Sequence, residues 1–313
     1  MRLLERSIVR KNHRKKWSAL ALAAAASLVL AGCTQLEDTG YLPGQRGTSD
    51  LGDGIATFWV NSWIALLAIG FLVWGLIIWA SVVYRRRKNE TGMPEQMRYH
   101  MPIEILFTVV PIILVFGLFA FTARDQAQVE ENWTADEMEV HIEVYGKQWA
   151  WDFNYLEVDG SPYDGGVYYQ GVQAVELRDE NGSTTGEIDY DQLPTLYLPV
   201  NAKVVIDLKS RDVAHSFWVP EFHYKEDTIP GKTNTFSFTP TREDTYIGKC
   251  AELCGEYHSM MLFQVEVVSQ EEYNAYIQSL EDAGNVGERG DEYNRNLNNP
   301  GTSVPEIVHE EQH

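Results

Sequence analysis

Two long apolar stretches constrain the fold of this 313-residue chain more than any other feature of its sequence. Residues 58–84 contain no charged side chain and are followed by four consecutive basic residues, whereas residues 103–121 contain one charge, Glu104. Each stretch has about the 20 residues that a helix needs to cross the hydrocarbon core of a membrane. The sequence therefore predicts a two-helix transmembrane hairpin within residues 58–124.

The basic residues between the two stretches predict the orientation of this hairpin. Cytoplasmic loops of membrane proteins carry an excess of Lys and Arg, so we expect the connecting loop on the cytoplasmic side. The segment at 33–57 and the chain after the second span would then be extracytoplasmic. The basic residues of the loop are Arg85, Arg86, Arg87, Lys88 and Arg98.

The first 32 residues are typical of a secretory signal peptide. Seven Lys or Arg residues precede an apolar stretch at 17–30, which is too short to span a membrane comfortably. Residues 30–33, Leu-Ala-Gly-Cys, resemble the lipobox of bacterial lipoproteins, in which cleavage leaves a lipid-modified cysteine at the new N-terminus. The sequence thus predicts a lipid anchor on Cys33; an ordinary signal peptide followed by an unrelated cysteine is the alternative.

The negative charge of the chain lies after the hairpin. The whole chain has 45 acidic and 25 basic residues, a net charge of −20, and residues 125–313 alone carry −26. This balance excludes a nucleic-acid-binding function, because attraction to phosphate requires a basic surface. A dense negative surface attracts a basic partner and speeds its docking, although solubility alone would also explain the charge.

Residues 139–280 have the pattern of a β-rich domain, to which we assign residues 125–280. Val140, Ile142 and Val144 alternate with polar or aromatic residues, which is the two-residue period of a strand. We therefore expect an all-β sandwich or a small barrel. Further short β-branched or aromatic runs lie at residues 203–208, 235–239 and 262–268.

Three other segments differ in composition from these strands. Residues 163–193 are rich in Gly, Asp and Tyr, and we expect an inserted loop or hairpin there. Residues 271–280 have the pattern of a short helix. Residues 281–313 are acidic and rich in Asn and Gly, a composition that predicts a disordered tail.

Two thiols, an imidazole and a thioether occur within twelve residues: Cys250, Cys254, His258 and Met261, with His215 upstream. Such soft ligands select copper or zinc over hard cations, and the thioether favours copper because structural zinc sites use Cys and His. Two thiolates can bridge two copper ions, each completed by one histidine and one weak ligand, an arrangement suited to rapid electron transfer. A disulfide between the two cysteines is the alternative in an oxidising compartment.

This pattern closely resembles that of subunit II of the haem–copper cytochrome c oxidases. The resemblance rests on Cys250-x-Glu252-x-Cys254-x-x-x-His258-x-x-Met261 and on the preceding Asp212-Val213-x-His215-Ser216-Phe217. It covers nearly all of residues 59–268. Three further motifs belong to it: EILFTVVP at 104–111, GKQWAW at 146–151 and IPGK at 229–232.

The resemblance implies a metal site and a fold. The fold would be membrane-anchored and all-β, with the N-terminal two-helix hairpin followed by a cupredoxin-like β-sandwich at 125–280. The Glu252 side chain matches a ligand of a magnesium ion shared with subunit I, and carboxylate ligation of magnesium is chemically usual. The residues that match ligands of the dinuclear copper centre CuA are His215, Cys250, Cys254, His258, Met261 and, through its backbone carbonyl, Glu252.

Two further positions match functional residues of this family. Trp149 matches the tryptophan through which electrons enter from cytochrome c, and we expect an exposed indole beside the copper loop. The alternative for Trp149 is an ordinary position in the core. One strand face would be shared by Trp149, Trp151, Phe153 and Tyr155. Glu104 matches a glutamate at the mouth of a proton path into subunit I, whereas an ordinary carboxylate at a membrane boundary is the alternative.

The resemblance further implies the role of an electron-accepting subunit of cytochrome c oxidase. Electrons would pass from cytochrome c to CuA and on to the haems of subunit I, where oxygen is reduced to water, coupled to proton pumping by the complex. The implied partners are oxidase subunits I and III, membrane lipid, and cytochrome c, either soluble or as a membrane-tethered subunit. The complex would lie in the bacterial plasma membrane with the copper domain outside.

Three other protein classes share part of the pattern. Quinol oxidases contain a related subunit without metal, which the intact set of cysteines, histidines and methionine argues against. A lipid-anchored copper-delivery module would not need two membrane spans. Nitrous oxide reductases share the copper loop, but no propeller domain is predicted from this sequence.

Overall fold

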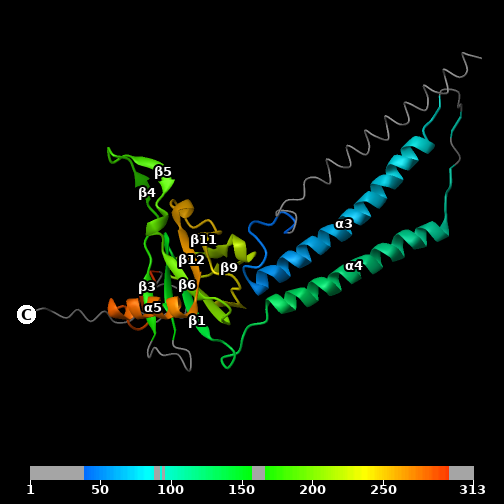
Figure 1. The fold of residues 1–313 in the computed structure, drawn as a ribbon. Coiled ribbons are helices and arrows are strands. Elements are labelled where there is room, and N and C mark those ends of the chain that lie inside the picture. Colours follow the sequence, from blue (N-terminus) through cyan, green and yellow to red (C-terminus); the bar gives the residue numbers. More distant parts are fainter. Residues whose placement is uncertain (1–38, 88–91, 94–95, 157–165, 296–313) are drawn as a thin grey trace, which may run out of the picture.

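The computed structural model describes residues 39–87, 92–93, 96–156 and 166–295. In these residues, two long helices lead into a β-sandwich that carries the remaining elements (Figure 1). The predicted signal peptide at 1–32, the predicted lipid attachment at Cys33 and the last part of the predicted tail lie outside the described residues.

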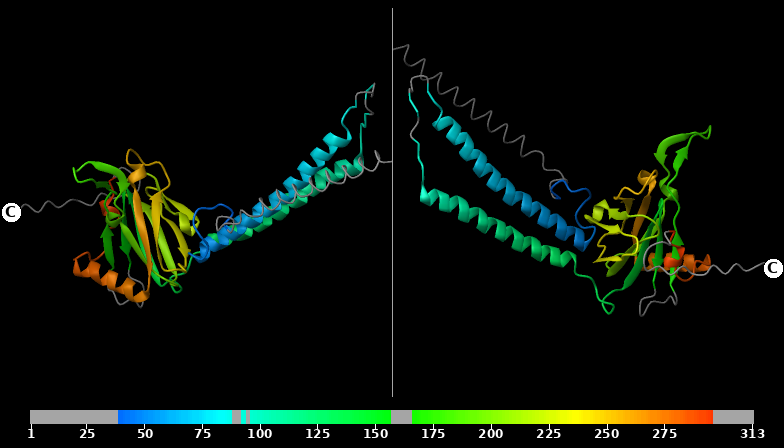
Figure 2. Two further views of the ribbon diagram at one scale, coloured as in Figure 1. Left: turned by 45° about the horizontal axis from the view of Figure 1, so that its top comes forward. Right: turned by 180° about the vertical axis from the view of Figure 1, so that it is seen from behind.

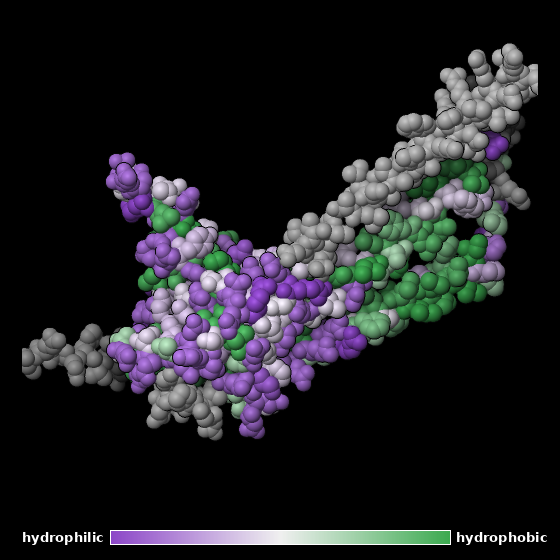
Figure 3. Space-filling view, viewed as in Figure 1, coloured by the Kyte–Doolittle hydropathy of each residue, from purple (hydrophilic) through white to green (hydrophobic). Residues whose placement is uncertain are grey.

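The two apolar stretches form helices that extend beyond the predicted spans. Helix α3 (Asp50–Val83) begins where the Ser49 side chain accepts a hydrogen bond from the Gly52 backbone N–H at 3.0 Å, which caps the helix. Helix α4 (Met101–Val129) begins after His100. Both are long and apolar enough to cross a membrane, and their apolar side chains lie on the surface in Figure 3.

Two five-stranded sheets pack face to face, which confirms the expected sandwich and not the barrel. The first sheet has the order β10-β7-β1-β2-β3 and the second the order β6-β12-β11-β8-β9. The β1–β7 and β12–β6 pairs are parallel and the others antiparallel. The strands are β1 (Val140–Lys147), β2 (Ala150–Tyr155), β3 (Val167–Gln170), β6 (Thr195–Pro199), β7 (Val204–Ser210), β8 (His215–Val219), β9 (Tyr224–Thr228), β10 (Asn234–Phe238), β11 (Asp244–Cys250) and β12 (Leu262–Val268).

The core lies between the sheets and is rich in aromatic rings. Trp151, Phe153 and Tyr155 alternate along β2 and point into it, as the sequence predicts. Trp151 meets Phe217 and Phe263 of the opposite sheet at ring-centroid distances of 5.7 and 5.3 Å. The predicted short helix is α5 (Gln270–Asp282), and the remaining short turns of helix are η1 (Tyr190–Gln192), η2 (Pro220–Phe222), η3 (His258–Met260) and η4 (Asp291–Tyr293).

The segment predicted to be an inserted loop divides into two parts. Within residues 163–193, β3 pairs with β2 and is therefore an edge strand of the first sheet. Strands β4 (Glu176–Arg178) and β5 (Thr184–Ile188) pair only with each other and form the expected hairpin, which projects from the sandwich (Figure 2). Residues 157–165 lie outside the described part.

The prediction of disorder from residue 281 onward is wrong for residues 281–295. Residues 285–295, which we name the C-terminal strap, follow α5 back along the outside of the sandwich (Figure 2). Asp152 and Asn154 face away from the aromatic core, yet both are buried, and Asn154 exchanges two hydrogen bonds of 3.1 Å with the Arg289 backbone. Composition alone suggested disorder because these contacts are made with distant parts of the chain.

A hydrogen-bonded joint connects α3 to the sandwich. The Asp50 backbone N–H donates to the Thr239 carbonyl at 3.2 Å, and the Thr239 N–H donates to the Asp50 carboxylate at 2.7 Å. Next to this pair, the Thr241 N–H donates to the Thr48 carbonyl at 3.0 Å. The membrane helix therefore begins inside the hydrogen-bond network of the β-domain.

Candidate metal centre

The predicted ligands lie at the ends of two adjacent strands. His215 is the first residue of β8, and Cys250 is the last residue of β11, with which β8 pairs. The loop after Cys250 returns through η3 to β12, and the Cys250 N–H donates to the Met261 carbonyl at 3.1 Å across its base. The Ala251 N–H donates to the Ser216 carbonyl at 3.0 Å. These bonds hold the loop against β8.

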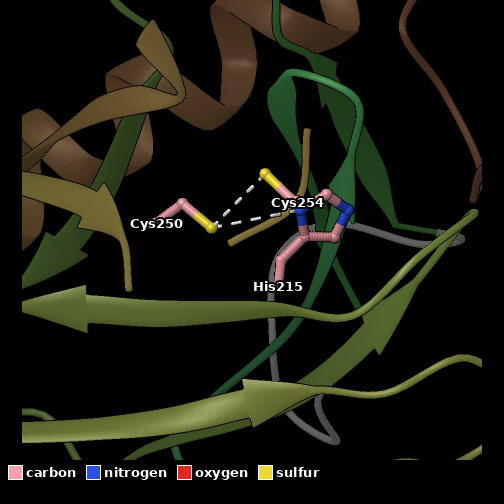
Figure 4. A group of neighbouring side chains, drawn as sticks. All are labelled: His215, Cys250 and Cys254. Atoms are coloured by element: carbon pink, nitrogen blue, oxygen red, sulfur yellow. Dashed lines mark hydrogen bonds between the residues drawn. The ribbon is translucent and has the colours of Figure 1, made fainter. Parts of the chain in front are cut away.

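Two thiols form the middle of the site (Figure 4). Cys250 and Cys254 are free and buried, and their Sγ atoms are 3.9 Å apart. The His215 Nδ1 lies 4.0 Å from the Cys250 Sγ, and the ligand atoms of the three residues all lie within 4.8 Å of one another. The cysteines are therefore not joined in a disulfide, the alternative that the sequence allowed.

The other three predicted donors surround this thiol pair. The Glu252 carbonyl lies 3.2 Å from the Cys250 Sγ. The His258 Nδ1 and the Met261 Sδ lie 3.5 and 3.8 Å from the Cys254 Sγ. Each thiol thus has one imidazole and one weaker donor within 4.0 Å. A set of two thiols, two imidazoles, a thioether and a carbonyl fits soft metal ions such as copper.

The His215 imidazole is held from two sides. Its Nε2 is 2.8 Å from the Asp212 carboxylate, which favours the tautomer that leaves Nδ1 free for a metal. A Cβ added at Gly146 would lie 2.9 Å from the His215 Cδ2, so only glycine leaves room for the ring there. The sequence motifs contain both residues, but their spacing does not indicate that they contact the ligand.

The surroundings of the two thiols shift their pKa values in opposite directions. Burial acts to raise the pKa of Cys250, but its contacts with His215 and backbone groups outweigh burial and lower it. Burial and the neighbouring Cys250 raise the pKa of Cys254 to about 12. Cys250 is therefore the thiol that ionises more readily. Because metals bind the thiolate form, Cys254 depends more on a bound cation to become ionised.

Trp149 lies beside the loop, as expected, but its indole is only partly exposed. Its ring centroid is 5.0 Å from that of Tyr257, and a Cβ at Gly255 would lie 3.1 Å from it. The Nε1 is buried, and none of the described residues offers it a hydrogen bond. The Gln148 side chain donates to the Cys254 carbonyl at 2.8 Å, a link between the two segments that the sequence did not reveal.

The other two predicted site residues are exposed and lie outside the thiol cluster. The Glu252 side chain is exposed on the loop, and only its carbonyl faces the thiols. Glu104 lies in the first turn of α4, at the end of the hairpin far from the sandwich (Figure 1). Its carboxylate accepts a 3.0 Å hydrogen bond from the His100 backbone N–H, as carboxylates in the first turn of a helix commonly do.

Two family models match the chain: the cytochrome c oxidase subunit II periplasmic domain over residues 140–268, and the transmembrane domain of the same subunit over residues 38–123. A probable cytochrome c oxidase subunit 2 of Streptomyces avermitilis is 41% identical over 328 residues, covering 94% of this chain and 98% of that one. The chain belongs to the cytochrome c oxidase subunit II family. It is thus a membrane-located subunit of a haem–copper oxidase.

Other subunit II proteins are also similar. Cytochrome c oxidase subunit 2 of Mycobacterium tuberculosis is 32% identical over 324 residues, covering 91% of this chain and 87% of that one. Among solved structures, the periplasmic domain of subunit II from Bradyrhizobium japonicum is 25% identical, covering 48% of this chain and 99% of that one, with a TM-score of 0.38. The β-sandwich of this subunit II chain corresponds to the first family model and its helical hairpin to the second.

Proposed function

We propose that the chain accepts electrons from cytochrome c at a dinuclear CuA centre and passes them to the haems of subunit I, where oxygen is reduced to water, coupled to proton pumping by the complex. The observation that carries this proposal is the position of four further donors around two free thiols 3.9 Å apart. A copper pair bridged by two thiolates accepts and releases one electron with little change in geometry.

The residues of the chain would hold and insulate this pair. The thiolates of Cys250 and Cys254 would hold the ions, together with His215, His258, Met261 and the Glu252 carbonyl. His215 and Met261 are fully buried, so water is excluded from one side of the centre. Asp212 would keep the His215 ring in the orientation that ligation requires.

Electrons from cytochrome c would enter through Trp149. Its ring packs on Tyr257 and Gly255 of the copper loop, so the path from the surface to the Cys254 ligand crosses few atoms. The net charge of −26 over residues 125–313 supports a basic cytochrome as donor, whether it is soluble or a membrane-tethered subunit.

The hairpin would place this domain on the extracytoplasmic side of the membrane. The basic loop after α3 supports a cytoplasmic location for the ends of the helices far from the sandwich. The exposed apolar faces of α3 and α4 would pack against subunits I and III and lipid, with Cys33 as a lipid attachment site. Glu104, at the cytoplasmic end of α4, would lie at the entrance of a proton path into subunit I.

Glu252 would have a second role at the contact with subunit I. Its side chain is exposed next to the copper ligands, and a carboxylate can ligate a magnesium ion that keeps several waters. The remaining ligands of that ion would come from subunit I. The same residue would then join the two metal sites, with its carbonyl towards copper and its carboxylate towards magnesium.

Copper stoichiometry tests the metal assignment. The full chain in detergent, loaded with copper, should hold two copper ions and show the purple spectrum of a mixed-valence pair. Cys254→Ser should abolish this spectrum, whereas Ser259→Ala, an exposed change in the same loop, should preserve it. One copper ion per chain, or binding of zinc only, would overturn the proposal.

Electron uptake tests the role of Trp149. In the assembled oxidase, Trp149→Phe should slow reduction by cytochrome c while copper content stays the same. Trp133→Phe is the matched control, because Trp133 lies in the linker after α4, where its backbone N–H contacts Ser237. Normal turnover of the Trp149 variant would show that electrons enter elsewhere.

A further inference from the structure

The C-terminal strap crosses the outer face of the first sheet. It begins by pairing antiparallel with edge strand β3, where the Tyr168 N–H donates to the Asn285 carbonyl and the Gly287 N–H donates to the Gly166 carbonyl, both at 3.0 Å. It then passes Asn154 of β2 and reaches Arg211, the residue after β7. The strap therefore connects the edge of the sheet with the segment that leads to the His215 ligand.

Arginine and tyrosine side chains alternate where the strap meets the sheet. The Arg211 guanidinium lies 3.9 Å from the Tyr145 ring centroid and 5.9 Å from that of Tyr293. The Arg289 guanidinium lies 3.8 Å from the Tyr293 centroid and 5.3 Å from that of Tyr168. Two strap residues, Arg289 and Tyr293, thus interleave with three residues of the domain, and cation–π attraction favours each contact.

Arg211 is the point at which the strap holds the domain most firmly. Its side chain is 4% exposed and donates to the Arg289 and Gly290 carbonyls at 2.7 and 2.9 Å and to the Asp152 carboxylate at 2.8 Å. Its own carbonyl accepts from the Arg295 N–H at 2.7 Å. Without the strap, the Arg211 guanidinium would keep Asp152 but lose the two carbonyl acceptors that fix its position from the other side.

The next residue along the chain is Asp212, which orients the ligand. Its carboxylate accepts from the Gln148 N–H at 2.8 Å and the Val213 N–H at 2.7 Å, as well as contacting His215. The Arg211 N–H donates to the Gly146 carbonyl at 2.9 Å. A displacement of Arg211 therefore moves the backbone that carries the Asp212 carboxylate.

We propose that the C-terminal strap positions the metal centre: it fixes Arg211, and thereby the Asp212 carboxylate that orients His215. This inference rests on the proposed function for the identity of the metal. Loss of a residue that directly orients a metal ligand typically reduces metal affinity 10- to 100-fold. The strap acts through one further residue, so we expect an effect of about tenfold.

Truncation of the full chain tests this role. A chain that ends at Gly284 lacks the strap, whereas a control chain that ends at Asn296 retains it. Both are loaded with copper in detergent, and the rate of copper loss to a chelator is measured together with the spectrum of the bound metal. The shorter chain should lose copper about tenfold faster and show an altered spectrum, and the control should match the unaltered chain.

Arg211→Lys keeps the positive charge but replaces the planar fork that reaches both strap carbonyls, so it tests the same link in a chain of full length. Hydrogen exchange of the Gln148 and Val213 N–H groups, measured without metal, should be faster in this variant and in the shorter chain. If hydrogen exchange and copper loss in the Arg211 variant match those of the unaltered chain, the proposal is wrong. This test remains valid even if the truncated chain does not fold. Failure of the unaltered chain to bind copper would instead contradict the proposed function, and the exchange measurement would still decide on the strap.

Discussion

Substituting Gly146 by alanine should displace the candidate ligand His215 by a predictable amount. The added Cβ would lie 2.9 Å from the His215 Cδ2 and 3.0 Å from the Thr228 Oγ1. Carbon atoms in contact are normally at least about 3.5 Å apart, so the ring must move by about 0.6 Å. Site residues must be held within about 0.5 Å of their working geometry, and we therefore expect copper affinity to fall about 10- to 100-fold.

The same overlap should also destabilise the metal-free domain. Forcing an extra methyl group into a packed interior costs about 1–3 kcal/mol, which corresponds to a fall in Tm of roughly 2–12 °C for a domain of this size. Copper competition titration and thermal unfolding measure the two effects. Gly54→Ala is the control, because a Cβ at this exposed glycine of α3 meets no atom within 4 Å. A Gly146 variant with unchanged copper affinity and Tm would refute the argument that the ring is held by close contact.

Three further predictions concern single side chains. Asp212→Asn should weaken copper binding about 10- to 100-fold in a competition titration, because it removes the charged partner of His215. Burial acts to raise the pKa of Asp207, but hydrogen bonds from His141 and Thr235 outweigh it and lower the pKa; the resulting stability is present above about pH 4 and is lost as pH falls through the lowered value. Asp207→Asn should therefore flatten the acid side of the stability curve in denaturant titrations at several pH values. Ser269→Ala removes the capping box of α5 and should lower the free energy of unfolding by about 1 kcal/mol.

The candidate metal ligands could be picked out from the sequence, but the residues that support them could not. Cys250, Cys254 and His258 lie close together along the chain, so their residue types and spacing indicate soft-metal chemistry before any fold is known. Asp212 and Gln148 act on the site through hydrogen bonds to His215 and to the Cys254 carbonyl. The local sequence around an Asp or Gln residue does not indicate whether its side chain reaches the candidate ligands. Only the fold reveals this.

The same division applies to the fold. The strands at 140–145 and 262–268 and the two apolar helices follow from local periodicity and hydropathy. The strap was missed because its order comes from contacts such as Arg289 with Tyr168 and Asn154, which join residues more than 100 positions apart. A strand with one solvated face alternates between buried and exposed residues. The strap covers the outer face of β2, which explains why β2 is buried on both faces.

The joint between α3 and the sandwich has a mechanical consequence. Strand β11 begins three residues after Thr241, which bonds to Thr48 in that joint, and it ends at the ligand Cys250. Seven residues of strand span about 20 Å, so β11 is a rigid connection of this length between the base of the membrane helix and the thiol pair. If α3 tilts by about 5° and carries the domain with it, Cys250 moves by about 2 Å over this length. A subunit that packs against α3 would therefore set the position of the candidate metal centre as well as that of the helix.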